Sequence, residues 1–142
     1  MFETLTATYG DVPYTEAGQA KTSSLFSPKY DTQENIYNGV LADLKKANEI
    51  LAKSTNAIGG DLMYNGGTAA IVKWRRLANS LRIRYLLRIS KKRNVAADLQ
   101  AIVGDPVNNP IFLNNADNAE LRYLAAAPNQ WPLYDSRVGS FD

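Results

Sequence analysis

Two long stretches with apolar residues at helical spacing constrain this fold more than any other feature of the sequence. In the first stretch, apolar residues recur at steps of three and four: Ile36, Val40, Leu44, Ala47 and Leu51. Charged residues occupy the other faces, which is typical of an amphipathic helix. The preceding Asp31-Thr-Gln-Glu34 resembles a capping box, whose side chains satisfy the free backbone N–H groups of a first helical turn. The pattern predicts a helix from about Thr32 to Lys53.

The second stretch follows a loop that contains Gly59-Gly60 and Asn65-Gly66-Gly67. Its apolar stripe consists of Ile71, Trp74, Leu77, Ala78, Leu81 and Tyr85. Thr68 is a candidate cap, so we expect a helix over residues 68–92 that packs antiparallel to the first helix. Apolar residues also lie on the back of this helix. It is therefore expected to be apolar nearly all round and largely buried, with Trp74 in the core.

The remaining segments are less regular. Residues 1–30, interrupted by glycine and proline, predict an irregular extended segment with at most a short strand. Residues 95–103 predict a third, short helix, which Gly104-Asp105-Pro106 ends. We expect one all-α section over 1–142, with a helical core at 31–104 and a loop-rich tail at 105–142. A short helix or strand is expected in that tail near Ala119–Leu124.

Composition excludes several classes of function. The 142 residues include no cysteine and no histidine. This excludes thiol nucleophiles, disulfides, histidine-based triads and zinc sites built on either residue. The sequence also lacks a phosphate-binding loop, a dinucleotide fingerprint and an EF-hand loop. We therefore expect no cofactor and no metal. The first residues do not resemble a signal peptide, so an export signal would have to lie outside this chain.

Basic residues are concentrated in the second predicted helix. Nine lysines and arginines and no acidic residue lie between Lys73 and Arg93, whereas both flanking regions are acidic. A nucleic-acid-binding helix presents one coherent basic face, but here the basic residues are divided between the two flanks of an apolar stripe. We therefore expect the arginines to pair with carboxylates of neighbouring segments, and we expect no nucleic acid as a partner.

Several motifs resemble, in the same order, those of the SusD/RagB-like outer-membrane nutrient-binding proteins. They are YGDVPYTEA at 9–17, SPKYDTQE at 27–34, DLMYNG at 61–66, WRRLANSLRIR at 74–84, RIS at 88–90 and NNADNA at 114–119. The core of the fourth motif, from Trp74 to Arg84, is the most specific. Gly67 departs from the pattern, because that family often has Asp there.

This resemblance implies a mostly helical fold with tetratricopeptide-like helix pairs. It also implies that the chain is an internal section of a longer lipoprotein, whose lipid anchor lies outside this chain. Such a protein faces outward from the cell outer membrane and is not an enzyme. It takes up oligosaccharide or another nutrient and delivers it to a TonB-dependent, SusC-like transporter.

The tail has the residue types that bind sugars. Aromatic faces stack on sugar rings, and amide and charged side chains bind the hydroxyl groups. Ligand-binding candidates are Asn129, Trp131, Tyr134 and Arg137. Trp131 could instead anchor this loop on the helices. Asn79 and Ser80 are expected to form hydrogen bonds to neighbouring loops.

Two other classes of function stay open. A glycosidase would need two carboxylates, such as the pair Asp11 and Glu16 or the pair Asp31 and Glu34, but capping explains the second pair. A helical scaffold that binds polypeptide and no small molecule is the main alternative, because solenoids of helix pairs usually bind protein.

Overall fold

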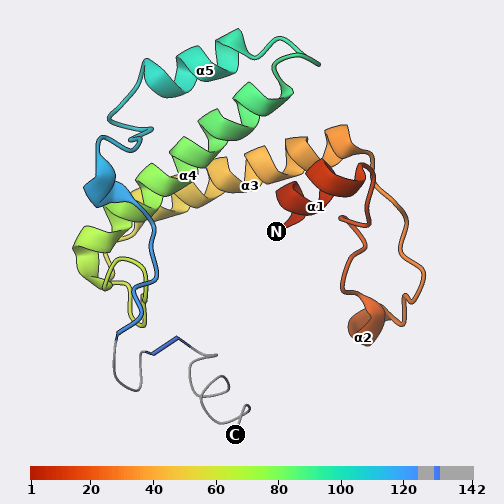
Figure 1. The fold of residues 1–142 in the computed structure, drawn as a ribbon, viewed down its shortest axis with the longest axis horizontal. Coiled ribbons are helices and arrows are strands. Elements are labelled where there is room, and N and C mark those ends of the chain that lie inside the picture. The colour runs from red at the N-terminus through yellow and green to blue at the C-terminus, as the bar shows by residue number, and fades with distance from the viewer. Residues whose placement is uncertain (125–129, 132–142) are drawn as a thin grey trace, which may run out of the picture.

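The computed structural model describes residues 1–124, 130 and 131, and the regular structure in these residues is helical. The helices are α1 (Phe2–Tyr9), α2 (Ala20–Ser23), α3 (Gln33–Lys53), α4 (Gly67–Ile89), α5 (Ala96–Val103) and the 3₁₀ helix η1 (Asn115–Asp117). In Figure 1, α3 and α4 run in opposite directions and cross, and α5 lies against α4. The predicted all-α fold with an antiparallel helix pair is confirmed. No helix of the described residues has the length and hydropathy needed to cross a membrane.

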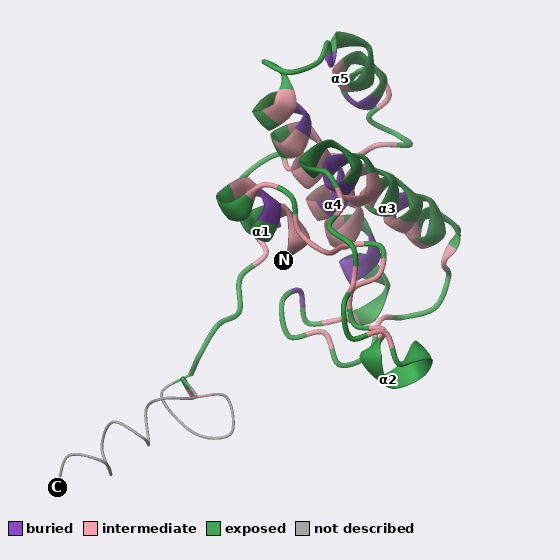
Figure 2. Cartoon of the chain, turned by 90° about the vertical axis from the view of Figure 1, so that its right-hand side faces the viewer, coloured by how far each residue is buried: buried purple, intermediate pink, exposed green. Residues whose placement is uncertain are grey.

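The core lies where α3, α4 and α5 meet. Leu86 of α4 packs with Val95 and with Ile102 of α5, and half-buried apolar side chains surround this cluster. Figure 2 shows that the outer faces of the helices are exposed. The prediction that α4 is largely buried was therefore wrong, since Leu87 is 56% exposed and Trp74 is only half-buried. Packing from α3 and α5 covers part of this helix and leaves the rest in solvent.

The predicted helix bounds are close to the observed ones, but the caps differ. Thr32 caps α3, because its side chain accepts a hydrogen bond from the backbone N–H of Asn35. Asp31 does not share in this cap. The expected cap of α4 by Thr68 was wrong, because the helix begins one residue earlier, after Gly66, without a side-chain cap.

The prediction of an irregular segment over residues 1–30 missed α1 and the one-turn helix α2. α1 packs on α3, and Thr6 in it is fully buried. The Glu3 carboxylate accepts a hydrogen bond of 3.3 Å from the Tyr37 hydroxyl and pairs with Arg88 at 3.5 Å. These contacts fix the N-terminal helix to both long helices.

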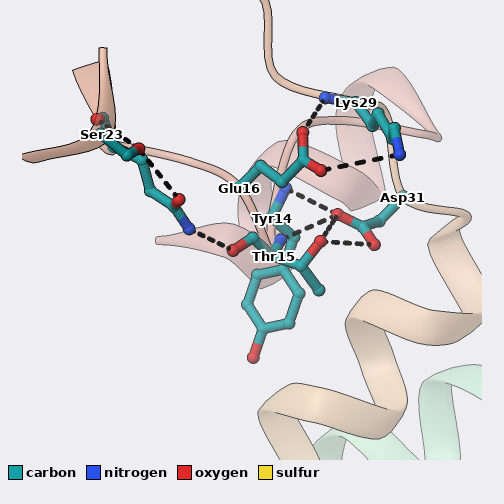
Figure 3. Close-up of polar contacts among 7 residues, drawn as sticks. Tyr14, Thr15, Glu16, Ser23, Lys29 and Asp31 are labelled. Carbon is teal, nitrogen blue, oxygen red and sulfur yellow. Dashed lines mark hydrogen bonds and ion pairs between the residues drawn. The ribbon is translucent and has the colours of Figure 1, made fainter. Parts of the chain in front are cut away.

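Carboxylates hold the segment from residue 11 to residue 31, which includes α2 (Figure 3). Asp31 accepts hydrogen bonds from the backbone N–H groups of Tyr14 and Thr15, at 3.0 and 2.8 Å. Glu16 accepts one from the backbone N–H of Lys29 at 2.8 Å. Asp31, assigned to the helix cap from the sequence, therefore closes this segment.

Among the described residues, four of the five arginines of α4 have partners, which are of two kinds. Arg76 pairs with Asp117 and Arg88 with Glu3, as predicted. Arg75 and Arg82 instead donate hydrogen bonds to amide side chains, and Arg75 also to backbone carbonyls. For these two residues the prediction of carboxylate partners was wrong.

Candidate ligand-binding site

Trp131 is the only one of the four predicted ligand-binding residues that lies among the described residues. Its ring meets that of Tyr123 edge to face, with ring centroids 5.0 Å apart and an interplanar angle of 84°. The side chain is still 51% exposed. Asn129, Tyr134 and Arg137 lie outside the described residues. The contact with Tyr123 is consistent with Trp131 as a packing residue, and its exposed half remains accessible to a ligand.

A cavity of about 650 Å³ lies beside Tyr123. Its size is in the usual range for small-molecule sites. Two segments far apart in the sequence form its walls: residues 61–65 form the first wall, and residues 116–124 contribute the second. The described lining residues are 61–65, Lys73, Ala116, Asn118, 120–124 and Gln130.

Asp61 organises the first wall. Its carboxylate accepts hydrogen bonds from the backbone N–H groups of Met63 and Tyr64, at 3.0 and 3.1 Å, and from the Trp74 indole N–H at 2.8 Å. Burial alone would raise the pKa of Asp61, but the hydrogen bonds from Trp74, Tyr64 and Met63 outweigh it and hold that pKa below its ordinary value. This carboxylate therefore stabilises the loop.

The turn after this loop requires left-handed backbone. Asn65 has φ 62° and Gly66 has φ 66°. Asparagine and glycine adopt this conformation most readily. A Cβ at Gly66 would also collide with the carbonyl oxygen of Ile58. The turn leaves the side chain of Asn65 on the cavity lining.

Asp117 organises the second wall. Its buried carboxylate accepts a hydrogen bond from the backbone N–H of Leu113 at 2.8 Å and pairs with Arg76 at 2.6 Å. The Leu113 N–H is the strongest of several contacts that lower the pKa of Asp117. Asp117 is the last residue of the 3₁₀ helix η1. The short helix or strand expected near residues 119–124 is not observed, because this segment has no regular structure.

A buried amide network fixes the chain that leads into the second wall. The Asn79 amide donates to the side-chain oxygen of Asn48 at 3.1 Å and to the carbonyl of Pro110 at 3.0 Å. The Ser80 hydroxyl accepts from the backbone N–H of Phe112 at 2.9 Å. The prediction that Asn79 and Ser80 bind neighbouring loops is confirmed.

Chemically, the cavity offers groups that both donate and accept hydrogen bonds, together with an aromatic ring. Such a lining suits a polar organic ligand. The described residues contain no group of three or more acidic side chains able to hold a metal ion. The carboxylates of Asp11, Glu16 and Asp31 each accept a hydrogen bond from a backbone N–H, so no described geometry favours the glycosidase alternative.

The residues of this cavity were not among the predicted ligand-binding residues. The predicted site rested on the density of aromatic and amide side chains in one short loop, residues 129–137. The stronger signal was the pair of motifs at 61–66 and 114–119, which contribute to the two walls. From the sequence, those motifs indicated only the family resemblance, because the sequence does not show that the two segments lie close together in space.

Comparison with known proteins decides the family. Residues 1–142 match the SusD-like family model, described as starch-binding and associating with the outer membrane. The chain belongs to the SusD-like family. Proteins of this family bind nutrients at the outer membrane and are not enzymes. A comparison with curated proteins gives no match.

Solved structures agree with this assignment. A Bacteroides vulgatus outer membrane protein, to which a role in nutrient binding is attributed, is 36% identical, with a TM-score of 0.79, over 92% of this chain and 28% of its own. A Bacteroides fragilis SusD homolog is 34% identical, with a TM-score of 0.78, over 95% of this chain and 28% of its own. A Bacteroides uniformis SusD homolog is 31% identical, with a TM-score of 0.67, over 88% of this chain and 25% of its own. The chain thus spans about 28% of the length of the first two relatives.

Proposed function

We propose that the full-length protein that contains this chain captures an oligosaccharide at the outer face of the outer membrane. It then delivers this ligand to a TonB-dependent, SusC-like transporter. A lipid anchor outside this chain would hold it at the membrane. The observation that carries the proposal is the match of all 142 residues to a family described as starch-binding and associating with the outer membrane.

The protein binds its ligand without transforming it. The carboxylates of Asp11, Glu16 and Asp31 accept hydrogen bonds from backbone N–H groups of the N-terminal segment. Those of Asp61 and Asp117 accept hydrogen bonds from backbone N–H groups of the cavity walls. Glycoside hydrolysis needs two opposed carboxylates available to the sugar. These five carboxylates hold backbone segments in place, which supports binding without catalysis.

The tail contributes to the ligand site through Asn129, Trp131, Tyr134 and Arg137. Support for this comes from the half-exposed ring of Trp131, which packs on a residue of the cavity lining. Stacking of an aromatic ring on the apolar face of a sugar would supply affinity, and the other three side chains would bind hydroxyl groups.

Calorimetry against a panel of oligosaccharides tests this function. The full-length protein is expected to bind at least one glycan. The 142-residue chain alone is expected to bind more weakly, because a ligand site gathers groups from several segments. Co-purification with a TonB-dependent, SusC-like transporter tests delivery. A protein that binds the transporter and ignores every glycan would be a helical interaction scaffold instead.

A further inference from the structure

Two amide side chains on opposite walls of the 650 Å³ cavity are free to bind a ligand. Asn65 lies on the first wall and Asn118 on the second, both exposed, and neither side chain has a hydrogen-bond partner among the described residues. A carboxamide both donates and accepts hydrogen bonds, and so does a sugar hydroxyl. An anion such as a carboxylate would need donors alone.

Tyr123 supplies an apolar surface next to these amides. Its side chain lines the cavity and is 42% exposed, and the Trp131 ring packs against it. Such an edge-to-face contact restricts how the tyrosine ring can turn. A ring that is held in position and half-exposed can stack on the C–H face of a sugar at little cost in conformational entropy.

The charges around the cavity cancel one another. The four charged lining residues are Asp61, Lys73, Glu120 and Arg122, two acidic and two basic. The Asp61 carboxylate is occupied by three donors, and Glu120 pairs with Arg122. The Lys73 ammonium lies 5.5 Å from the centre of the Tyr64 ring, in cation–π contact. The cavity therefore has no excess of positive charge to recognise an acidic ligand.

We infer that this cavity is a subsite for a neutral sugar ring, with Asn65 and Asn118 on its hydroxyl groups and Tyr123 on its apolar face. The inference rests on the proposed function and deepens it. It places the ligand partly on residues outside the predicted loop at 129–137, and it restricts the ligand class to uncharged oligosaccharides.

Titrations of the full-length protein and its variants test the inference. The ligands are neutral hexose oligomers and uronic-acid oligomers of the same length. Asn118→Ala removes one amide, and Asn65→Gly removes the other while keeping the left-handed backbone. Tyr123→Ala removes the ring. Asn38→Ala, on the exposed surface of α3, is the matched control.

The unmodified protein is expected to prefer the neutral oligomers. Each of the two asparagine variants should bind them about five- to tenfold more weakly, since a hydrogen bond contributes about 1 kcal/mol. Asn38→Ala should bind as the unmodified protein does, and all variants should keep their melting temperature within about 2 °C.

Wild-type affinity in Asn65→Gly, Asn118→Ala and Tyr123→Ala would overturn the cavity assignment and leave the proposed function standing. A preference for the acidic oligomers would overturn the ligand class. Absence of binding to any glycan would overturn the proposed function itself.

Discussion

The hydroxyl group of Tyr64 donates a 3.0 Å hydrogen bond to the backbone carbonyl of Asp117, 53 residues further along the chain. This bond joins the loop that follows α3 to the turn around η1. Tyr64 also meets the Trp74 ring edge to face, with centroids 5.3 Å apart. The two walls of the cavity are thus tied to each other and to α4.

Replacing Tyr64 by Phe should therefore lower stability with little change in shape. The variant keeps the contact with Trp74 but leaves the Asp117 carbonyl without its partner. We expect a loss of about 1 kcal/mol in the free energy of unfolding, measured with denaturant. Tyr9→Phe serves as control, because Tyr9 is 74% exposed. Equal stability of the two variants would mean that the bond between the walls contributes nothing.

Asn79 is one of the polar side chains that hold residues 107–112 against the long helices. It is fully buried and binds both Asn48 and the carbonyl of Pro110. Asn79→Ala leaves buried polar partners unsatisfied, which costs about 2–3 kcal/mol. Asn38→Ala on exposed α3 surface should cost under about 0.5 kcal/mol. Thermal unfolding of the two variants side by side gives the comparison.

Acid should destabilise the chain through aspartates that the fold stabilises in their charged form. The pKa values of Asp31, Asp61, Asp105 and Asp117 are all lowered. A lowered pKa in the folded state gives stability above the ordinary value of about 4, and that stability is lost as the pH falls through the folded pKa.

Asp117→Asn should reduce the dependence of stability on pH in this acidic range. At neutral pH the same variant should be less stable, because it loses the ion pair with Arg76. Urea unfolding between about pH 2 and pH 7 measures both effects. A variant whose stability declines with acid as steeply as that of the unmodified chain would show that Asp117 is not one of the responsible groups.

Trp131→Ala should weaken glycan binding by the full-length protein about tenfold, because it removes a stacking surface and loosens Tyr123. Tyr134→Ala in the same protein tests the rest of the predicted loop. Phe26→Ala is the control, since Phe26 is 80% exposed. If Trp131→Ala binds normally, Trp131 is a packing anchor and the ligand does not touch it.

The basic residues of α4 should not bind nucleic acid. Arg76 and Arg88 are paired with carboxylates, and Arg75 and Arg82 bind amide groups of the fold itself. Fluorescence anisotropy with duplex DNA at low salt is expected to show no saturable binding. Tight binding that weakens steeply with added salt would contradict this.

The long helices were predictable because their information is local. The apolar repeat from Ile36 to Leu51 determines which face of α3 packs against the rest of the protein. The observed helix begins at Gln33, one residue after the predicted start. α1 was missed because its eight residues are too few for a clear period and carry no side-chain cap.

Roles that depend on distant partners could not be read from the sequence. Asp31 fits a capping box locally, yet Thr15, sixteen residues earlier, offers it a backbone N–H and a hydroxyl. The partners of Arg75 are set by how residues 107 and 108 pass α4. The cavity lining likewise joins Asn65 to Asn118, whose separation of 53 positions hides their proximity.

A crystal structure of the full-length protein with a neutral oligosaccharide that it binds is the most direct test of the account. It should show one sugar ring between the two walls, within hydrogen-bond distance of Asn65 and Asn118 and against the ring of Tyr123. A ligand bound entirely elsewhere, with this cavity empty or filled by the protein's own side chains, would contradict the account.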